Sequence, residues 1–83
     1  MNTRNIPVTV TKGLFDSERA VEIELTDGKK VSLFVDCQSI IRQGGKTFLP
    51  LELVRESAQQ WDVLLPTEAF ETMSRWATVR AAA

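Results

Sequence analysis

The chain has no histidine and no tyrosine, and it has a single cysteine, Cys37. Without histidine it lacks the commonest general base at neutral pH and the most frequent ligand of transition metals. One cysteine cannot supply the ligands of a structural zinc site, and it forms no disulfide within the chain. The sequence therefore predicts no catalytic residues, no metal site and no cofactor, and a protein that is not an enzyme.

Neither sign of charge is in excess, with 10 lysines and arginines against 11 aspartates and glutamates. This balance disfavours nucleic acid as a partner, because phosphate contacts require many cations. No apolar run approaches the ~18 residues of a membrane span, and no apolar segment typical of a secretory signal follows the polar start of the chain. We expect a cytoplasmic protein without a membrane partner.

The residues that are present suit one small folded unit. Hydrophobic residues make up 43% of the 83 residues and charged residues 25%, which is the usual globular balance. No repeat, low-complexity segment or change of composition divides the chain. We predict a single domain over 1–83 with one modest core.

Two stretches, 20–26 and 29–35, alternate between apolar and polar side chains, which is the pattern of half-buried strands. A three-residue loop at 26–28, with Gly28 in the left-handed conformation, keeps the apolar residues of both strands on one side of the hairpin. A two-residue loop would mix the two faces, so we favour the longer one. The inward-facing residues are then Val21, Ile23, Leu25, Val31, Leu33 and Val35.

Further strands are predicted on weaker patterns. Residues 6–12 alternate as one strand, with Pro7 at its start or at a sheet edge. Residues 43–46 predict a hairpin turn, and 49–56 a strand with an edge position or a bulge at Pro50. A short helix over 51–61 is the alternative. A buried strand follows over 61–65.

The C-terminal segment fits two structures. A helix over 67–80 would place Phe70, Met73 and Trp76 on one stripe, whereas 75–81 also alternates as a final strand. The predicted class is mainly β: a five- or six-stranded bent sheet or partly open barrel of the SH3-like or OB-like kind, with or without that helix. Trp61 and Trp76 are expected in the core.

Phe34 is the first candidate binding residue, because the hairpin places it on the polar face beside Glu22. Exposed aromatic rings on a sheet bind protein partners or stack on bases. The alternative is that Phe70, Met73 and Trp76 cover it. Glu22 itself fits a solvated face paired with lysine, or an acidic surface for a basic partner.

A second candidate is the set of cations around the predicted turn at 43–46. Arg42, Lys46 and Arg55 would form a small basic patch there. Together with Phe34 they define the alternative function, a small-barrel protein that binds single-stranded RNA or DNA.

The function that the sequence favours is a non-enzymatic interaction or accessory module. A short open sheet has unpaired edges, which must be protected or paired with a protein partner or a second copy, as in a homodimer. A subunit that completes an active site with carboxylates is the least supported alternative.

Overall fold

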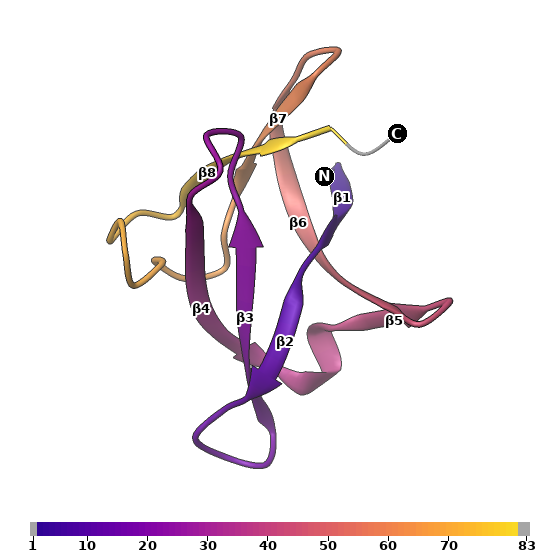
Figure 1. Ribbon diagram of the computed structural model, residues 1–83, viewed down its shortest axis with the longest axis vertical. Coiled ribbons are helices and arrows are strands. Elements are labelled where there is room, and N and C mark those ends of the chain that lie inside the picture. Colours follow the sequence, from indigo (N-terminus) through magenta and orange to yellow (C-terminus); the bar gives the residue numbers. More distant parts are fainter. Residues whose placement is uncertain (1, 82–83) are drawn as a thin grey trace.

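The computed structural model describes residues 2–81 and is mainly β (Figure 1). Its strands form two antiparallel sheets, and a single 3-10 turn, Cys37–Ser39, lies between β4 and β5. The strands are β1 (Thr3–Pro7), β2 (Thr9–Lys12), β3 (Glu18–Glu24), β4 (Lys30–Asp36), β5 (Ile41–Gln43), β6 (Lys46–Glu56), β7 (Gln60–Leu64) and β8 (Trp76–Arg80).

The larger sheet has the order β1-β6-β7-β8, with β5 also paired to β6, and the smaller has the order β2-β3-β4. The strand predicted over 6–12 is divided between them. Val8 marks the crossing: its N–H donates to the carbonyl of Thr47 at 3.1 Å, and its own carbonyl accepts from Thr47 Oγ1 at 2.6 Å. Pro7 ends β1 just before this point, because it has no N–H with which to continue a ladder.

The β3–β4 hairpin has the predicted register. Ile23 lies opposite Val31, and Val21 opposite Leu33. The N–H of Leu25 donates to the carbonyl of Lys29 at 2.8 Å, which closes the three-residue loop, and Gly28 has a φ of +85°. Glycine adopts this left-handed conformation without steric cost. The apolar alternation alone was sufficient to predict this pairing.

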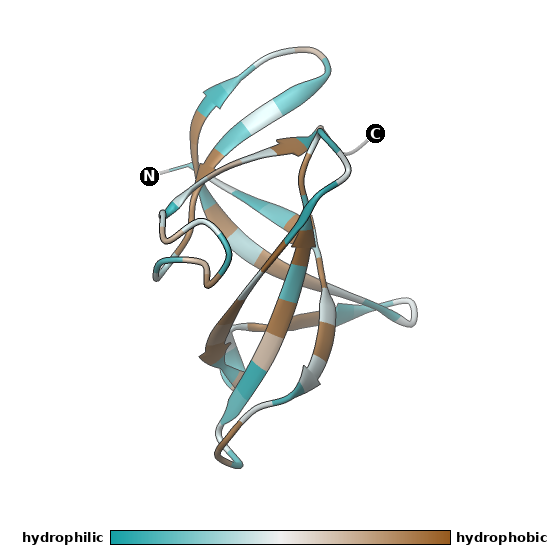
Figure 2. Cartoon of the chain, turned by 60° about the vertical axis from the view of Figure 1, so that its left-hand side comes forward, coloured by the Kyte–Doolittle hydropathy of each residue, from teal (hydrophilic) through white to brown (hydrophobic). Residues whose placement is uncertain are grey.

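The core lies between the two sheets, and hydropathy alternates along the strands that enclose it (Figure 2). The inward-facing residues of both β3 and β4 contribute to this core, and the loop after β7 adds Ala69. The buried set is Ile6, Val8, Val21, Ile23, Val31, Leu33, Val35, Leu49, Leu51, Val63, Leu65, Ala69, Ala77 and Val79.

The middle of the chain is strand and not the alternative helix. β5 and β6 are joined by a tight turn in which Gly44 and Gly45 have φ of +56° and +76°. Pro50 lies within β6, after the last residue paired with β5 and before the first paired with β7. It therefore removes no ladder bond on that side. A bulge does occur, but at Val54.

The C-terminal helix over 67–80 is not formed. Residues 66–75 are turns, and Trp76–Arg80 is the strand β8, antiparallel to β7. In β8, paired with β7, Ala77 and Val79 are buried. The mainly β class is confirmed. The sheets contain eight strands in place of five or six, and over residues 2–81 they do not close into a barrel.

Candidate functional site

Phe34 is half-buried, and its cover comes from the loop 66–75. The ring of Phe70 meets it edge to face, with centroids 5.3 Å apart and planes at 78°. The N–H of Phe70 also donates to the carbonyl of Ser32 at 2.9 Å, on the outer edge of β4. The covering predicted for Phe34 is thus present in Phe70, and it comes from a loop.

Glu71 holds the same loop to β4. Its carboxylate accepts from both the N–H and the hydroxyl of Ser32, the first at 2.7 Å. These two hydrogen bonds to the charged form lower the pKa of Glu71 below its ordinary value of 4.5. Phe70 and Glu71 together occupy backbone groups that an edge strand leaves open.

The loop 66–75 is also bonded within itself. The N–H of Ala69 donates to the carbonyl of Ser74 at 3.0 Å, and the N–H of Met73 to the carbonyl of Ala69 at 2.8 Å. Arg75 Nε donates to the carbonyl of Leu65 at 2.8 Å. Because these contacts define its shape, the loop presents Phe70 and Met73 to solvent in one arrangement, 60% and 74% exposed.

Trp76 is 59% exposed, so its prediction as a core residue is wrong. The alternation of β8 turns Ala77 and Val79 inward and Trp76 outward. The indole lines a hollow of about 400 Å³ with the carboxylates of Asp27 and Asp62. Asp62 Oδ1 accepts from Thr78 Oγ1 at 2.7 Å. Asp27 Oδ1 accepts from the N–H of Lys29 at 2.9 Å.

We group two exposed sites that follow each other along the chain, Phe70 and Met73 of the loop and Trp76 with Asp27 and Asp62 of the hollow, and call them the aromatic surface. Its members come from the loop after β7, from β8, from β7 and from the turn between β3 and β4. Sequence analysis named its apolar residues, but as a cover for Phe34 or as core. The alternation of residues 75–81 was the signal that could have placed Trp76 outside.

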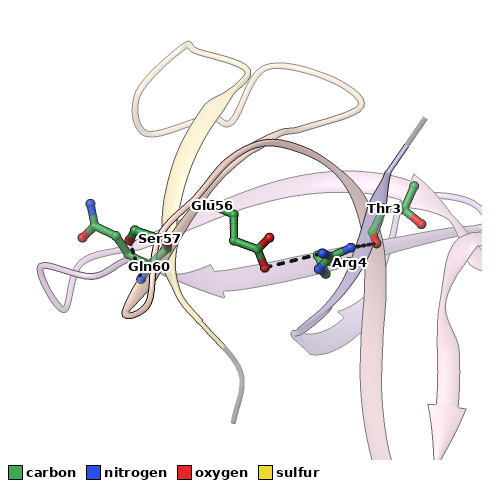
Figure 3. Close-up of polar contacts among 5 residues, drawn as sticks. All are labelled: Thr3, Arg4, Glu56, Ser57 and Gln60. Carbon is green, nitrogen blue, oxygen red and sulfur yellow. Dashed lines mark hydrogen bonds and ion pairs between the residues drawn. The ribbon is translucent and has the colours of Figure 1, made fainter.

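Trp61 contrasts with Trp76. It packs against the core and is half-buried, as predicted. The guanidinium of Arg4 lies 5.6 Å from its ring centroid. Arg4 is held there by an ion pair with Glu56 at 3.4 Å and by the carbonyl of Thr3 (Figure 3). Trp61 is therefore occupied by contacts within the chain.

The three predicted basic residues are not brought together. Arg42 and Lys46 belong to the β5–β6 hairpin, whereas Arg55 lies near the far end of β6 opposite Asp62. The nine residue steps from Lys46 to Arg55 along β6 correspond to roughly 30 Å. Phe34, on the other sheet, contacts Phe70.

Arg42 has different neighbours from those predicted. It lines a hollow of about 460 Å³ with Lys12, Phe15 and Arg19. These residues come from both sheets and from the loop between β2 and β3, so only the packing of the sheets brings them together. None of these three neighbours of Arg42 was predicted from the sequence.

The loop between β2 and β3 exposes two large apolar side chains, Leu14 at 75% and Phe15 at 69%. Its shape is fixed from within. The N–H of Leu14 donates to Glu18 Oε1 at 2.9 Å, and Arg19 Nη1 donates at 2.8 Å to the carbonyls of Asp16 and Glu18. We call Leu14 and Phe15, flanked by Lys12, Arg19 and Arg42, the basic tip.

Glu22 is exposed and makes an ion pair with Lys30 at 3.7 Å. The two residues line a groove of about 320 Å³ where the sheets separate, together with Glu24 and Arg80. This arrangement agrees with the first of the two predictions for Glu22, an exposed side chain paired with a lysine. Lys30 lies directly opposite Glu24 in the ladder, so its ion pair with Glu22, the residue opposite Ser32, is diagonal.

Among residues 2–81, no group of three or more cysteine, aspartate or glutamate side chains is placed to hold a metal ion. No helix in this part of the chain has the length and apolarity needed to cross a membrane. No protein-family model, no curated protein and no solved structure matches this chain.

Proposed function

We propose that this chain is a non-enzymatic interaction module, and that its aromatic surface binds a protein segment bearing apolar and basic side chains. The observation that supports this most is the exposure of three large apolar residues, Phe70, Met73 and Trp76, within seven positions. Aromatic residues and methionine are the types enriched at the centres of protein interfaces.

The aromatic surface is prepared for contact before a partner arrives. The loop that bears Phe70 and Met73 is fixed by backbone bonds and by Glu71. A partner would therefore need to order few loop residues on binding, and the entropy lost in such ordering is one of the main costs of binding. Met73 has a φ of +54°, a conformation that disfavours a non-glycine residue. The fold thus keeps an exposed methionine in an unfavourable conformation, a pattern associated with functional sites.

The charge around this surface favours a basic partner. Asp27 and Asp62 flank Trp76, and the loop adds Glu68 and Glu71, so four carboxylates stand against two cations, Arg75 of the loop and Lys29 of the turn. Indole is also the best aromatic face for a lysine or arginine side chain. A segment that alternates leucine with lysine or arginine would satisfy both the apolar and the acidic parts.

A peptide titration tests the proposal. In a Trp61→Phe background the fluorescence reports on Trp76 alone, and we expect a leucine–lysine peptide to change it, whereas a leucine–glutamate peptide does not. Met73→Ser should weaken binding roughly 5- to 30-fold, the range for loss of a contact worth ~1–2 kcal/mol.

Val54→Ser is the matched control, since Val54 is an exposed apolar residue, 45% accessible, on β6. It should leave the affinity for the leucine–lysine peptide unchanged. Equal binding by wild type, Met73→Ser and a Trp76→Thr variant, measured by titration calorimetry because the last lacks the fluorescent reporter, would show that the aromatic surface is not the binding surface.

The basic tip is the observation that favours the second candidate, a protein that binds single-stranded nucleic acid. Phe15 with Lys12, Arg19 and Arg42 offers a ring for stacking and cations for phosphate. Retention on a single-stranded oligonucleotide that falls steeply with salt, and is lost in Phe15→Ser, would support it. A cytoplasmic location remains part of the proposal, because the chain has one cysteine and no possible internal disulfide.

A further inference from the structure

We propose that the partner of the aromatic surface is a second copy of this chain, which inserts its basic tip there. Leu14 and Phe15 of one copy would lie against Phe70, Met73 and Trp76 of the next. The cations beside the tip would face Asp27 and Asp62. The inference rests on the proposed function and names the occupant of the same surface.

The two surfaces together hold most of the exposed large hydrophobic side chains of the described residues. Six large hydrophobic residues are exposed among those that the structure describes. Five belong to the two surfaces, and Val54 is the sixth. A contact between tip and surface would remove the five from water together, which is the usual driving force for association.

The charges are opposite at the two surfaces. Between residues 2 and 81 the ion pairs within 4.0 Å are Arg4 with Glu56 and Lys30 with Glu22. Lys12, Arg19 and Arg42 therefore have no carboxylate partner within the described chain, although Asp16 lies in the same hollow. Three cations meeting two carboxylates would steer the tip to the aromatic surface and away from its own copy.

The positions of the two surfaces determine what kind of assembly results. The basic tip precedes β3, and Asp27 of the aromatic surface follows it, so they lie at opposite ends of that strand (Figure 1). The seven residues of β3 separate them by roughly 23 Å. Phe70 lies nearer to the tip, over Phe34, but the tip is bonded within its own loop and cannot reach Asp27 and Trp76 of its own copy. Contacts between two different surfaces are head to tail, and they build rings or open chains of copies.

A mixing experiment tests this directly. The tip variant carries Leu14→Ser and Phe15→Ser, and the surface variant carries Met73→Ser and Trp76→Thr. Wild type should increase in sedimentation mass with concentration, from about 10 µM to about 1 mM, since a contact this small belongs to the weak class. Each variant alone should remain a monomer.

The mixture of the two variants decides between this contact and others. One intact tip and one intact surface remain in it, so we expect a heterodimer and no larger species. A mixture that stays monomeric, or single variants that associate as wild type does, would overturn the inference. Circular dichroism of each variant establishes that it is folded, and Val54→Ser serves again as the control that should assemble normally.

Charge reversal gives a second measurement that does not depend on apolar residues. Asp27→Lys and Arg42→Glu should each reduce association at low salt, and the chain that carries both should recover most of it, because each contact again joins opposite charges. Failure of the double variant to recover would contradict the proposed pairing of the two surfaces.

The outcomes also separate this inference from the proposed function. If the leucine–lysine peptide binds the aromatic surface while wild type stays a monomer at about 1 mM, the proposed function stands and the second copy is excluded as partner. If the tip variant loses retention on a single-stranded oligonucleotide and wild type stays a monomer, the basic tip binds nucleic acid and the inference fails.

Discussion

The two faces of the β3–β4 hairpin share one backbone but have opposite environments. On the inner face Val21, Ile23, Val31 and Leu33 are 3% exposed or less, because the larger sheet covers them. On the outer face Glu22 is exposed, and Phe34 is half-covered by Phe70 from a loop. The inner face therefore contributes mainly to stability, and the outer face borders the surface available to a partner.

The largest expected effect is on the inner face. Leu33→Ala should lower the free energy of unfolding by about 2–5 kcal/mol, because it removes a fully buried side chain and leaves a cavity. Chemical denaturation measures this directly. Lys30→Ala, an exposed neighbour on the same strand, should change stability by less than about 1 kcal/mol. Similar losses at both positions would show that the hairpin does not separate an inner from an outer face.

A smaller effect is expected between Phe34 and Phe70 on the outer face. A double-mutant cycle with Phe34→Ala and Phe70→Ala should give a coupling of about 0.5–1.5 kcal/mol, the range for an edge-to-face aromatic pair. A coupling near zero in denaturation experiments would mean that the loop does not rest on β4 in solution. Loss of this contact should also weaken peptide binding, because the loop bearing Met73 would lose its support.

The smallest effect concerns the carboxylate that attaches the loop to β4. The pKa of Glu71 is lowered in the folded protein by its bonds to Ser32, so its contribution to stability is complete above about pH 4.5 and is lost as the pH falls through the lowered value. Wild type should therefore be more stable than Glu71→Gln at pH 7, and the difference should shrink towards pH 3.

Glu68→Gln is the matched control for that titration, since Glu68 is an exposed glutamate on the same loop for which the structure shows no hydrogen bond to β4. Its stability relative to wild type should change less with pH. A Glu71→Gln difference that stays constant from pH 7 to pH 3 would mean that the contact with Ser32 is absent in solution.

Prediction from the sequence succeeded where a pattern was local and repeated. The hairpin register followed from alternation over seven residues on each side of a glycine turn, because a slip of one residue would expose every apolar side chain. It was undecided over 67–80, where helical spacing and strand alternation both fitted. Pairing with β7, which precedes the loop 66–75, decided the matter in favour of a strand.

In the candidate site too, local contacts were predicted from the sequence and contacts between distant segments were not. Phe34 was identified as an outward aromatic residue from hairpin geometry, and Phe70 was named with Met73 and Trp76 in the alternative that the C-terminal segment covers it. Arg42 was named as a cation, but its neighbours Lys12 and Arg19 are more than twenty residues away and belong to the other sheet. Distance along the chain gives no information about such a neighbourhood, so Arg42 was grouped with Arg55 instead.

The amino-acid sequence by itself determined the mainly β class, the inner face of the hairpin and the lack of histidine chemistry, because these depend on residue types and on periods of two. Tertiary structure alone decided that Trp76–Arg80 is a strand and not part of a helix, that β1 and β2 separate into two sheets, and that cations from three segments line a hollow with Phe15. The reason is physical. Alternation specifies which side of a strand is apolar, whereas the partner that covers that side is chosen only when the two sheets pack.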